Sequence, residues 1–316
     1  MTDCNETPNP LFAPLPNFAL SANGKILNLS KPRIMGILNV TPDSFSDGGQ
    51  FTATHTALAR VDEMLRQGAD IIDIGAESTR PNATPVTDDL ELARLTPIVR
   101  EIKKTYPNLW LSIDTSSPAV MAQMADLGAD IWNDVRGLQR AGACDMASRL
   151  ALPVVLMHSR GEPLTMNKMA VYDDVLAEVL AELGGLVDKA LRAGVRRENI
   201  VLDVGMGFAK EYGHHIDIVK HLGEFGKLGY PMLFGVSRKR FVGEILAGSG
   251  IETLANNNPA ERDTASTALA LFALAQGRAL CGRIMWRRWH KAWRCGMHSR
   301  IGRRISNRFL LISIFL

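Results

Sequence analysis

The segment "LWLSIDTSSPAVMAQMADLG" (residues 109–128) contains the structural unit from which this chain is built. Its first part, residues 109–114, is a short apolar run that ends in the carboxylate Asp114. A polar turn follows, and residues 118–127 have the apolar spacing of a helix that Gly128 closes. One strand, one turn and one helix in succession predict a β-loop-α unit, the repeat of folds with a parallel sheet.

The same unit recurs along the chain, because seven apolar runs rich in β-branched residues are each followed by a polar or Gly-rich turn and a helical stretch. The runs cover residues 34–40, 71–75, 109–114, 130–134, 153–157, 200–205 and 231–237. Strands that are apolar almost throughout indicate burial on both faces of a parallel sheet. The pattern predicts an α/β fold, a (β/α)₈ TIM barrel in which the eighth strand and the final helix are in doubt.

A doubly wound sheet is the alternative fold. Such a sheet is expected to carry a G-x-G-x-x-G turn after its first strand, and "NVTPDSFSDGG" (39–49) does not match that pattern.

Charge is distributed unevenly along the chain. Residues 281–316 carry nine Lys and Arg and no acid, which leaves 27 basic against 33 acidic residues before them. A mildly acidic main body argues against nucleic-acid binding, which needs a basic surface. The four scattered cysteines predict reduced thiols. The N-terminus lacks a signal-peptide pattern and the final apolar run is too short to span a bilayer, so we expect a cytoplasmic protein without membrane contact.

Polar residues follow every one of the seven runs. One Asp after a strand is more often the cap of the next helix than a ligand contact. In barrels, however, the carboxyl ends of the strands carry the active site, and the joint pattern predicts a site there. The residues are Asn39, Asp73, Asp114, Asn133, Asp134, His158 after Met157, Asp203, Ser237, Arg238 and Lys239.

Six motifs taken together resemble the dihydropteroate synthase family: "ILNVTPDSFSDGG", "GADIIDIGAESTRP", "SIDTSSPAV", "GADIWNDV", "LDVGMGFAK" and "GVSRKRFVGEI". The resemblance implies a pterin-binding TIM barrel over 33–280, after an N-terminal extension, 1–32. It also implies a transferase reaction of folate biosynthesis, which sulfonamides inhibit. In it, p-aminobenzoate displaces pyrophosphate from 6-hydroxymethyl-7,8-dihydropterin diphosphate and gives 7,8-dihydropteroate.

The resemblance also implies the roles of individual residues. Buried carboxylates and an amide accept hydrogen bonds from a pterin edge, which assigns the pterin to Asp114, Asn133, Asp203, Lys239 and Met157. The p-aminobenzoate pocket is assigned to Phe45, Thr79, Arg80, Pro81, Phe208 and Ser237. Asn39 is assigned to Mg²⁺ at the departing diphosphate, and the catalytic residues are Asn39, Asp114 and Lys239. The alternatives are strand-end caps for the polar residues, core packing for Met157 and surface exposure for Lys239.

The chain departs from the family after about Leu280. Family members close the barrel with an eighth strand that bears Arg-x-His, whereas "GRIMWRRWHKAWRCGMH" (282–298) has neither strand alternation nor a clean apolar helix face. Reading the codons one nucleotide back allows Arg-x-His, so our hypothesis is a frameshift that makes 281–316 an aberrant basic tail. A genuine alternative C-terminus and a basic arm for nucleic acid or membrane are the rival explanations.

Three function classes follow from these observations. The first is an active dihydropteroate synthase with small-molecule substrates, possible as a homodimer. The second is an inactive or weakly active pterin-binding chain that lacks the Arg-x-His strand. The third is a pterin-binding barrel of the methyltetrahydrofolate-corrinoid methyltransferase type, against which the loops "TPDSFSDGG" (41–49) and "ESTRP" (77–81) argue.

Overall fold

The structure is a computed structural model. It describes residues 18–40, 49–79, 83–248, 258–275 and 280–283. Among these residues, no helix is long and apolar enough to cross a membrane. The predicted site residues Phe45, Arg80 and Pro81 and most of the predicted tail, residues 284–316, lie outside the described residues.

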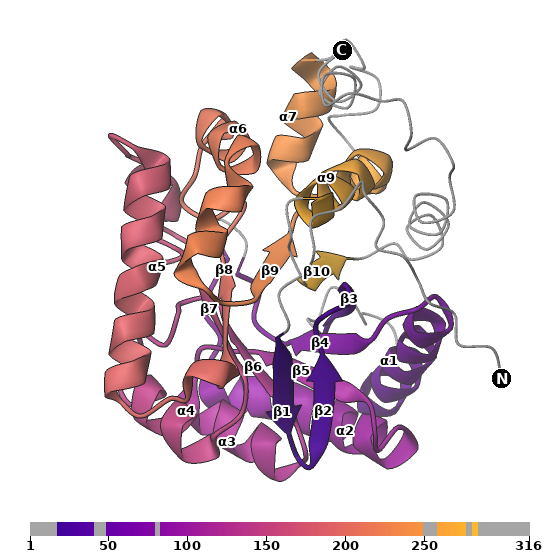
Figure 1. Cartoon of the computed structure of the whole chain (residues 1–316). Coiled ribbons are helices and arrows are strands. Elements are labelled where there is room, and N and C mark those ends of the chain that lie inside the picture. The colour runs from indigo at the N-terminus through magenta and orange to yellow at the C-terminus, as the bar shows by residue number, and fades with distance from the viewer. Residues whose placement is uncertain (1–17, 41–48, 80–82, 249–257, 276–279, 284–316) are drawn as a thin grey trace, which may run out of the picture.

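Eight parallel strands form a closed barrel in the order β10-β3-β4-β5-β6-β7-β8-β9 (Figure 1). The predicted (β/α)₈ barrel is therefore confirmed, and the seven apolar runs of the sequence correspond to β3–β9. The strands are β3 Arg33–Asn39, β4 Ile71–Gly75, β5 Trp110–Asp114, β6 Ile131–Asp134, β7 Val154–Met157, β8 Ile200–Asp203, β9 Met232–Gly235 and β10 Leu280–Arg283.

The eighth strand, which the sequence left in doubt, is present and closes the barrel. Leu280 of β10 is paired with Arg33 of β3 on one side and with Leu233 of β9 on the other, both in parallel. Parallel pairing is made by backbone groups, so a strand between two neighbours needs no alternation of side chains. The sequence analysis placed the end of the barrel at residue 280 and the start of the tail at 281. Because β10 runs from Leu280 to Arg283, Cys281–Arg283 belong to the barrel instead.

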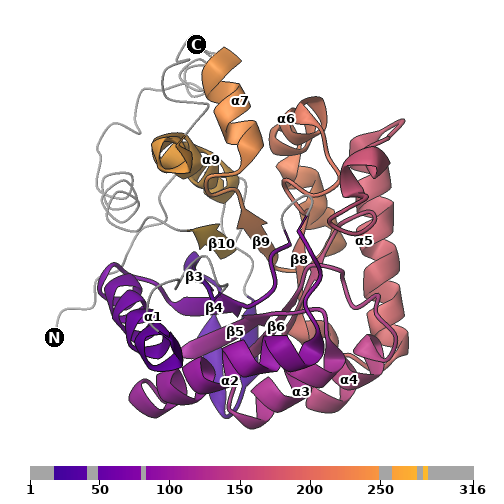
Figure 2. The same cartoon turned by 180° about the vertical axis from the view of Figure 1, so that it is seen from behind.

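The helices surround the barrel, as the two opposite views show (Figures 1 and 2). They are α1 Gly49–Arg66, α2 Asp88–Thr105, α3 Pro118–Asp126, α4 Ala143–Leu150, α5 Val175–Arg192, α6 Tyr212–Lys220, α7 Arg240–Gly248 and α9 Asp263–Ala275. Capping side chains mark the starts of α2, α3 and α5; Asp174, for example, accepts from the backbone N–H groups of Leu176 and Ala177, both at 3.0 Å, where α5 begins.

The strands are buried on both faces. In β4, Ile71, Ile72 and Ile74 have no exposed surface, although successive strand residues point to opposite faces of the sheet. One face packs into the barrel interior and the other against the helices, which explains why the strands read as continuous apolar runs.

A hairpin that the sequence analysis did not predict lies before the barrel. Its strands, β1 Ala19–Ala22 and β2 Lys25–Asn28, are antiparallel, and both turn residues, Asn23 and Gly24, have positive φ, 49° and 72°. Lys25 Nζ lies 2.7 Å from Oδ2 of the buried Asp130, which directly precedes β6. The hairpin thus covers the amino ends of the strands, and the carboxyl ends remain for the site.

Candidate active site

Three polar side chains meet at the carboxyl ends of β4, β5 and β6. Asp114 pairs in register with Gly75 on one side and with Asn133 on the other. The Asn133 Nδ2 donates to Oδ2 of Asp73 at 3.1 Å, and both side chains are buried. A Cβ at Gly75 would lie 3.2 Å from Oδ2 of Asp114, so glycine leaves room for that carboxyl group. The structure brings together Asp114, Asn133 and Asp73, all expected at the strand ends; Asp73 had not been assigned to a substrate.

Asp203 and Lys239 lie at the neighbouring ends of β8 and β9. The Asp203 Oδ1 accepts from the backbone N–H of Gly205 at 2.8 Å. Lys239 donates through Nζ to the carbonyl of Met206, and its Nζ lies 4.8 Å from the centre of the Phe208 ring. Burial lowers the pKa of Lys239, while the charges of Asp203 and Asp114 oppose that effect. The lysine therefore interacts electrostatically with both carboxyl groups.

Burial also shifts the carboxyl groups toward their neutral forms. It raises the pKa of Asp73 to about 6 and, with the charge of Asp73 adding to the effect, raises the pKa of Asp114 well above its usual range. The pKa of Asp203 is raised by burial and held down in part by Lys239. A group of carboxyl oxygens that can exist protonated near neutral pH offers donors as well as acceptors to a heterocycle. Met157, the predicted apolar pterin contact, is buried opposite Asp203 in the register of β7 and β8.

The turn after β8 depends on glycine. Gly205 has φ 66°, and a Cβ there would lie 1.8 Å from the carbonyl oxygen of His158. Gly207 has φ 85°, and a Cβ there would lie 3.0 Å from Cδ of Lys239. The two glycines therefore bring the turn against β7 on one side and against the lysine on the other.

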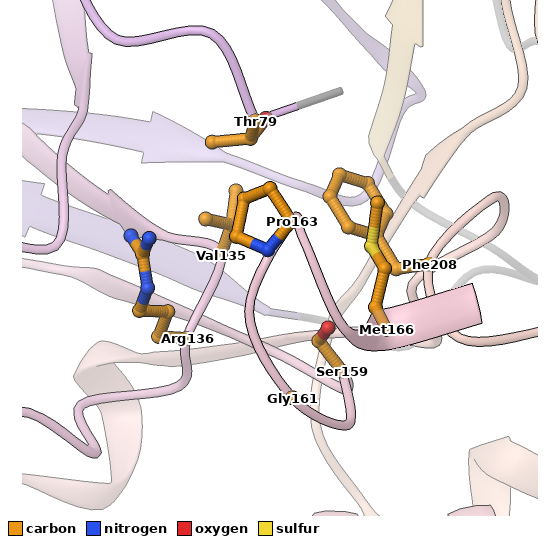
Figure 3. A pocket seen from close by; sticks show the side chains of 8 residues that line it. All are labelled: Thr79, Val135, Arg136, Ser159, Gly161, Pro163, Met166 and Phe208. Atoms are coloured by element: carbon orange, nitrogen blue, oxygen red, sulfur yellow. The ribbon is translucent and has the colours of Figure 1, made fainter. Parts of the chain in front are cut away.

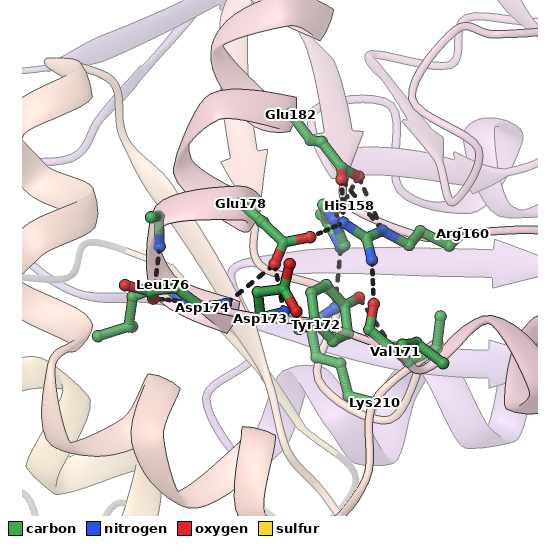
Figure 4. A network of polar contacts seen from close by, with 12 residues as sticks. His158, Arg160, Val171, Tyr172, Asp173, Asp174, Leu176, Glu178, Glu182 and Lys210 are labelled. Atoms are coloured by element: carbon green, nitrogen blue, oxygen red, sulfur yellow. Dashed lines mark hydrogen bonds and ion pairs between the residues drawn. The ribbon is translucent and has the colours of Figure 1, made fainter.

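A network of charged groups connects Lys210, at the end of this turn, with His158, Arg160 and Glu182 (Figure 4). Lys210 Nζ lies 2.9 Å from Nδ1 of His158 and donates to the carbonyls of Gly205 and Phe208 at 3.2 and 3.0 Å. The His158 Nε2 lies 2.9 Å from Oε2 of Glu182. Burial lowers the pKa of His158 to about 4, so the ring is neutral, donates from Nε2 to the carboxylate and accepts at Nδ1.

Arg160 extends the network to α5. It forms ion pairs with Glu182 and Glu178, and its guanidinium carbon lies 3.9 Å from the centre of the Tyr172 ring. The Tyr172 hydroxyl donates to the carbonyl of Ala209 at 2.9 Å. The turn at 205–210 is thus tied to one rigid helix through both Lys210 and Tyr172.

A pocket lies beside these carboxyl ends (Figure 3). Its lining residues are Thr79, Val135, Arg136, Ser159, Gly161, Pro163, Met166 and Phe208. Thr79 and Phe208, both predicted for p-aminobenzoate, come together in it, although they are far apart in the sequence. The other lining residues were not predicted, and the polar loops that follow β6 and β7 were their only signal in the sequence.

Arg136 is the charged member of this pocket. Its Nε and Nη2 lie 2.8 and 2.7 Å from Oε2 of Glu162, and its Nη1 lies 3.5 Å from Oε2 of the buried Glu77. Two carboxylates of the chain therefore already offset the positive charge of this guanidinium.

The remaining predicted residues lie at the rim. Ser237 is half-buried after the end of β9, and Asn39 is exposed at the end of β3. Within the ranges that the structure describes, no group of three or more His, Cys, Asp or Glu could hold a metal ion. The amide oxygen of Asn39 suits Mg²⁺, which is usually bound through few protein ligands together with substrate phosphates.

The sequence profile of the pterin binding enzyme family matches residues 35–282. The chain belongs to this family. Within the pterin-binding enzymes it is similar to the dihydropteroate synthase of Haemophilus influenzae, with 47% identity over 227 residues that cover 72% of this chain and 82% of the relative. The Escherichia coli K12 dihydropteroate synthase is 42% identical over 82% of this chain and 88% of its own length. The resemblance that the six motifs indicated is confirmed.

Solved structures of pterin-binding enzymes agree with the fold. Xanthomonas albilineans dihydropteroate synthase with 4-aminobenzoic acid has a TM-score of 0.81 and 37% identity, over 90% of this chain and 100% of that one. Yersinia pestis dihydropteroate synthase in a sulfonamide drug complex gives the same TM-score, identity and coverage.

Proposed function

We propose that this chain catalyses the condensation of 6-hydroxymethyl-7,8-dihydropterin diphosphate with p-aminobenzoate, which gives 7,8-dihydropteroate and pyrophosphate. The observation that carries the proposal is the convergence of Asp114, Asn133, Asp203 and Lys239 at one end of the barrel of a pterin-binding enzyme. Relatives of this chain are dihydropteroate synthases, and one solved relative holds 4-aminobenzoic acid.

The pterin would bind against the buried carboxyl groups. Asp73 accepts a hydrogen bond from Nδ2 of Asn133. The Oδ1 of the same amide would then accept from a donor on the pterin. Asp114 and Asp203 supply further oxygens for the N–H groups of the amino-pyrimidine edge, and Lys239 places a positive charge beside them. Met157 would supply an apolar contact to the ring. A ligand with fewer donors would leave buried oxygens unpaired, which makes the site selective for pterins.

Asn39 would hold Mg²⁺ together with the diphosphate oxygens, and the bound ion would stabilise the charge that develops on the leaving group. Departure of pyrophosphate leaves a pterin methylene cation, and the amine of p-aminobenzoate adds to it and then loses a proton. The reaction needs no protein nucleophile. Thr79 and Phe208 would form one wall of the p-aminobenzoate site, which Phe45, Arg80, Pro81 and Ser237 complete.

The first test is pyrophosphate release by the purified chain, with the pterin diphosphate present and p-aminobenzoate added or omitted. We expect release that depends on p-aminobenzoate, a product with the mass of 7,8-dihydropteroate, and competition by a sulfonamide. Pterin binding without turnover would instead favour the inactive chain that lacks Arg-x-His. Activity should then return when residues from 281 onward are replaced by the shifted reading frame. Binding of methyltetrahydrofolate without any response to sulfonamide would favour the methyltransferase type.

Two further properties belong to the same proposal. The free thiol of Cys144 agrees with a reducing compartment such as the cytoplasm. A homodimer remains part of the proposal, and sedimentation of the purified chain tests it.

A further inference from the structure

Arg238 has an unusual backbone conformation between two residues of the proposed site. Its φ is 58°, in the left-handed region that a residue with a Cβ adopts only at a cost. Ser237 precedes it and Lys239 follows it, so the turn at Arg238 sets the directions in which both neighbours leave the end of β9. Glycine would adopt this conformation without strain, yet the chain carries arginine here.

One short segment of the chain binds the backbone N–H, the carbonyl, the Nε and the Nη2 of Arg238. The Nε and Nη2 donate to Oδ1 and Oδ2 of Asp263, both at 2.9 Å, as a bidentate pair. The backbone N–H donates to Oγ of Ser266 at 3.1 Å, and the carbonyl accepts from Nη1 of Arg262 at 3.0 Å. These partners lie at the start of α9, 24 to 28 residues further along the chain. We call Arg238, Arg262, Asp263 and Ser266 the α9 clamp.

The geometry of the α9 clamp fixes the orientation of the Arg238 side chain. A planar guanidinium on a carboxylate fixes direction as well as distance, and a lysine in its place would make only a point contact. Asp263 is 2% and Arg238 25% exposed, so solvent and salt screen this pair less than the neighbouring Arg240–Glu244 pair, in which Arg240 is 89% exposed. The hydrogen bonds of the Arg238 backbone N–H and carbonyl lie on either side of its Cα. They therefore restrain the backbone of Arg238 in this conformation directly.

We propose that Arg238 and Asp263 are positioning residues, which keep the strained turn in place so that Lys239 faces Asp203 and Asp114 and Ser237 faces the second substrate. This inference rests on the proposed function. From the clamped turn, the Lys239 side chain reaches the carbonyl of Met206 and the ring of Phe208. A relaxed turn would redirect the Lys239 side chain, and a displacement of about 1 Å in a positioning group can cost a factor of roughly a hundred in rate.

The test uses Asp263→Asn and Arg238→Lys in the full chain, with Glu244→Gln as the matched control. The control removes an arginine partner of the same chemistry from the exposed pair on α7. We expect both clamp variants to raise KM for the pterin diphosphate and for p-aminobenzoate at least tenfold and to lower kcat, while Glu244→Gln leaves all three unchanged. Wild-type KM and kcat in folded Asp263→Asn and Arg238→Lys would overturn the inference.

A second measurement separates this inference from the proposed function. Backbone hydrogen exchange of the peptide spanning 236–242 reports on the turn itself, with or without turnover. We expect exchange at least tenfold faster in Asp263→Asn than in Glu244→Gln. If the wild-type chain shows no synthase activity but this difference is found, the proposed function fails and the clamp stands. Equal exchange in the two variants would contradict the clamp even in an active enzyme. If Asp263→Asn does not fold, Arg238→Lys, which keeps the charge, takes its place in both measurements.

Discussion

Asn133 and Asp73 form a buried amide–carboxyl pair, with Nδ2 of the amide 3.1 Å from Oδ2 of the carboxyl group, on the two strands that flank β5. The pair decides which end of the amide meets a ligand. Because the nitrogen is engaged by Asp73, we expect the oxygen of Asn133 to act as the acceptor for a bound pterin. Asp73 therefore influences recognition through another residue.

Replacing Asp73 by Asn should weaken pterin binding. Two amides can pair in either orientation, so Asn133 would present its NH₂ group in part of the molecules. We expect an affinity loss of roughly tenfold, ~1.4 kcal/mol, by calorimetry with the pterin diphosphate. Asp70→Asn, which removes an Arg33 ion pair at the opposite end of β4, is the control. Equal affinity in the two variants would contradict the prediction.

Lys239→Met should separate function from stability. Its positive charge lies between two carboxyl groups at the proposed reaction centre, so we expect kcat/KM to fall roughly a hundredfold, ~2.7 kcal/mol. Since burial lowers the pKa of this lysine, an apolar residue of similar length should leave the melting temperature unchanged or raise it. The exposed Lys220→Met on α6 is the matched control for steady-state kinetics and thermal melts. A large loss of stability with preserved kcat/KM would show that Lys239 is structural.

Two glycine substitutions separate backbone strain from steric clash. Gly24 and Gly205 have φ of 72° and 66°, but a Cβ at Gly24 meets nothing within 4 Å, whereas one at Gly205 would lie 1.8 Å from the carbonyl oxygen of His158. Gly24→Ala should therefore cost only the strain, ~1 kcal/mol, or a few degrees in Tm. Gly205→Ala should cost several times as much, because backbone must move against backbone. Equal losses in thermal unfolding would contradict the close approach of the turn to β7.

The contribution of His158 to stability should fall as the pH is lowered from about 6.5 to 4, against the opposite contribution of buried carboxyl groups such as Asp73, whose pKa is raised to about 6. Burial lowers the pKa of His158 to about 4, whereas an unfolded histidine titrates near 6.5, so in this window only the unfolded state binds the proton. Above this window both states are neutral at this residue and the effect vanishes. The full loss is roughly 3 kcal/mol.

Denaturant unfolding across the same pH range checks this prediction. His158→Gln should flatten the decline, because glutamine carries no titrating proton. The dependence that remains should then come from other groups, such as His215, whose pKa burial lowers to about 3, and Asp73, whose raised pKa acts in the opposite direction. An unchanged slope in His158→Gln would show that His158 is not responsible.

The barrel could be predicted from sequence because its strands are buried on both faces, and the seven apolar runs match β3–β9 within two residues. The hairpin was missed although its signal is present: Asn23-Gly24 is a dipeptide typical of a two-residue turn with positive φ. The eighth strand was doubted because residues 282–298 show no strand alternation and no Arg-x-His, whereas β10 pairs with a neighbouring strand on each side.

The strand-end residues of the candidate site were predictable, but most of the pocket lining and the contacts between side chains were not. Asp114, Asn133 and Asp203 follow strands directly, and a closed barrel must gather them at one end. The pairing of Arg238 with Asp263 depends on where α9 lies against the end of β9, and no local pattern in either segment encodes that distance. The same holds for Lys210 and His158, which are 52 residues apart in the chain.

The hairpin at the amino ends of the strands also constrains the order in which the chain folds. Lys25 reaches Asp130 across 105 residues, and Lys103 lies 2.8 Å from the same carboxylate. During synthesis from the N-terminus, β1 and β2 leave the ribosome long before the segment that follows α3 has been made. The contact between Lys25 and Asp130 can therefore form only after the chain has been made as far as β6, so docking of the hairpin depends on a long-range pairing.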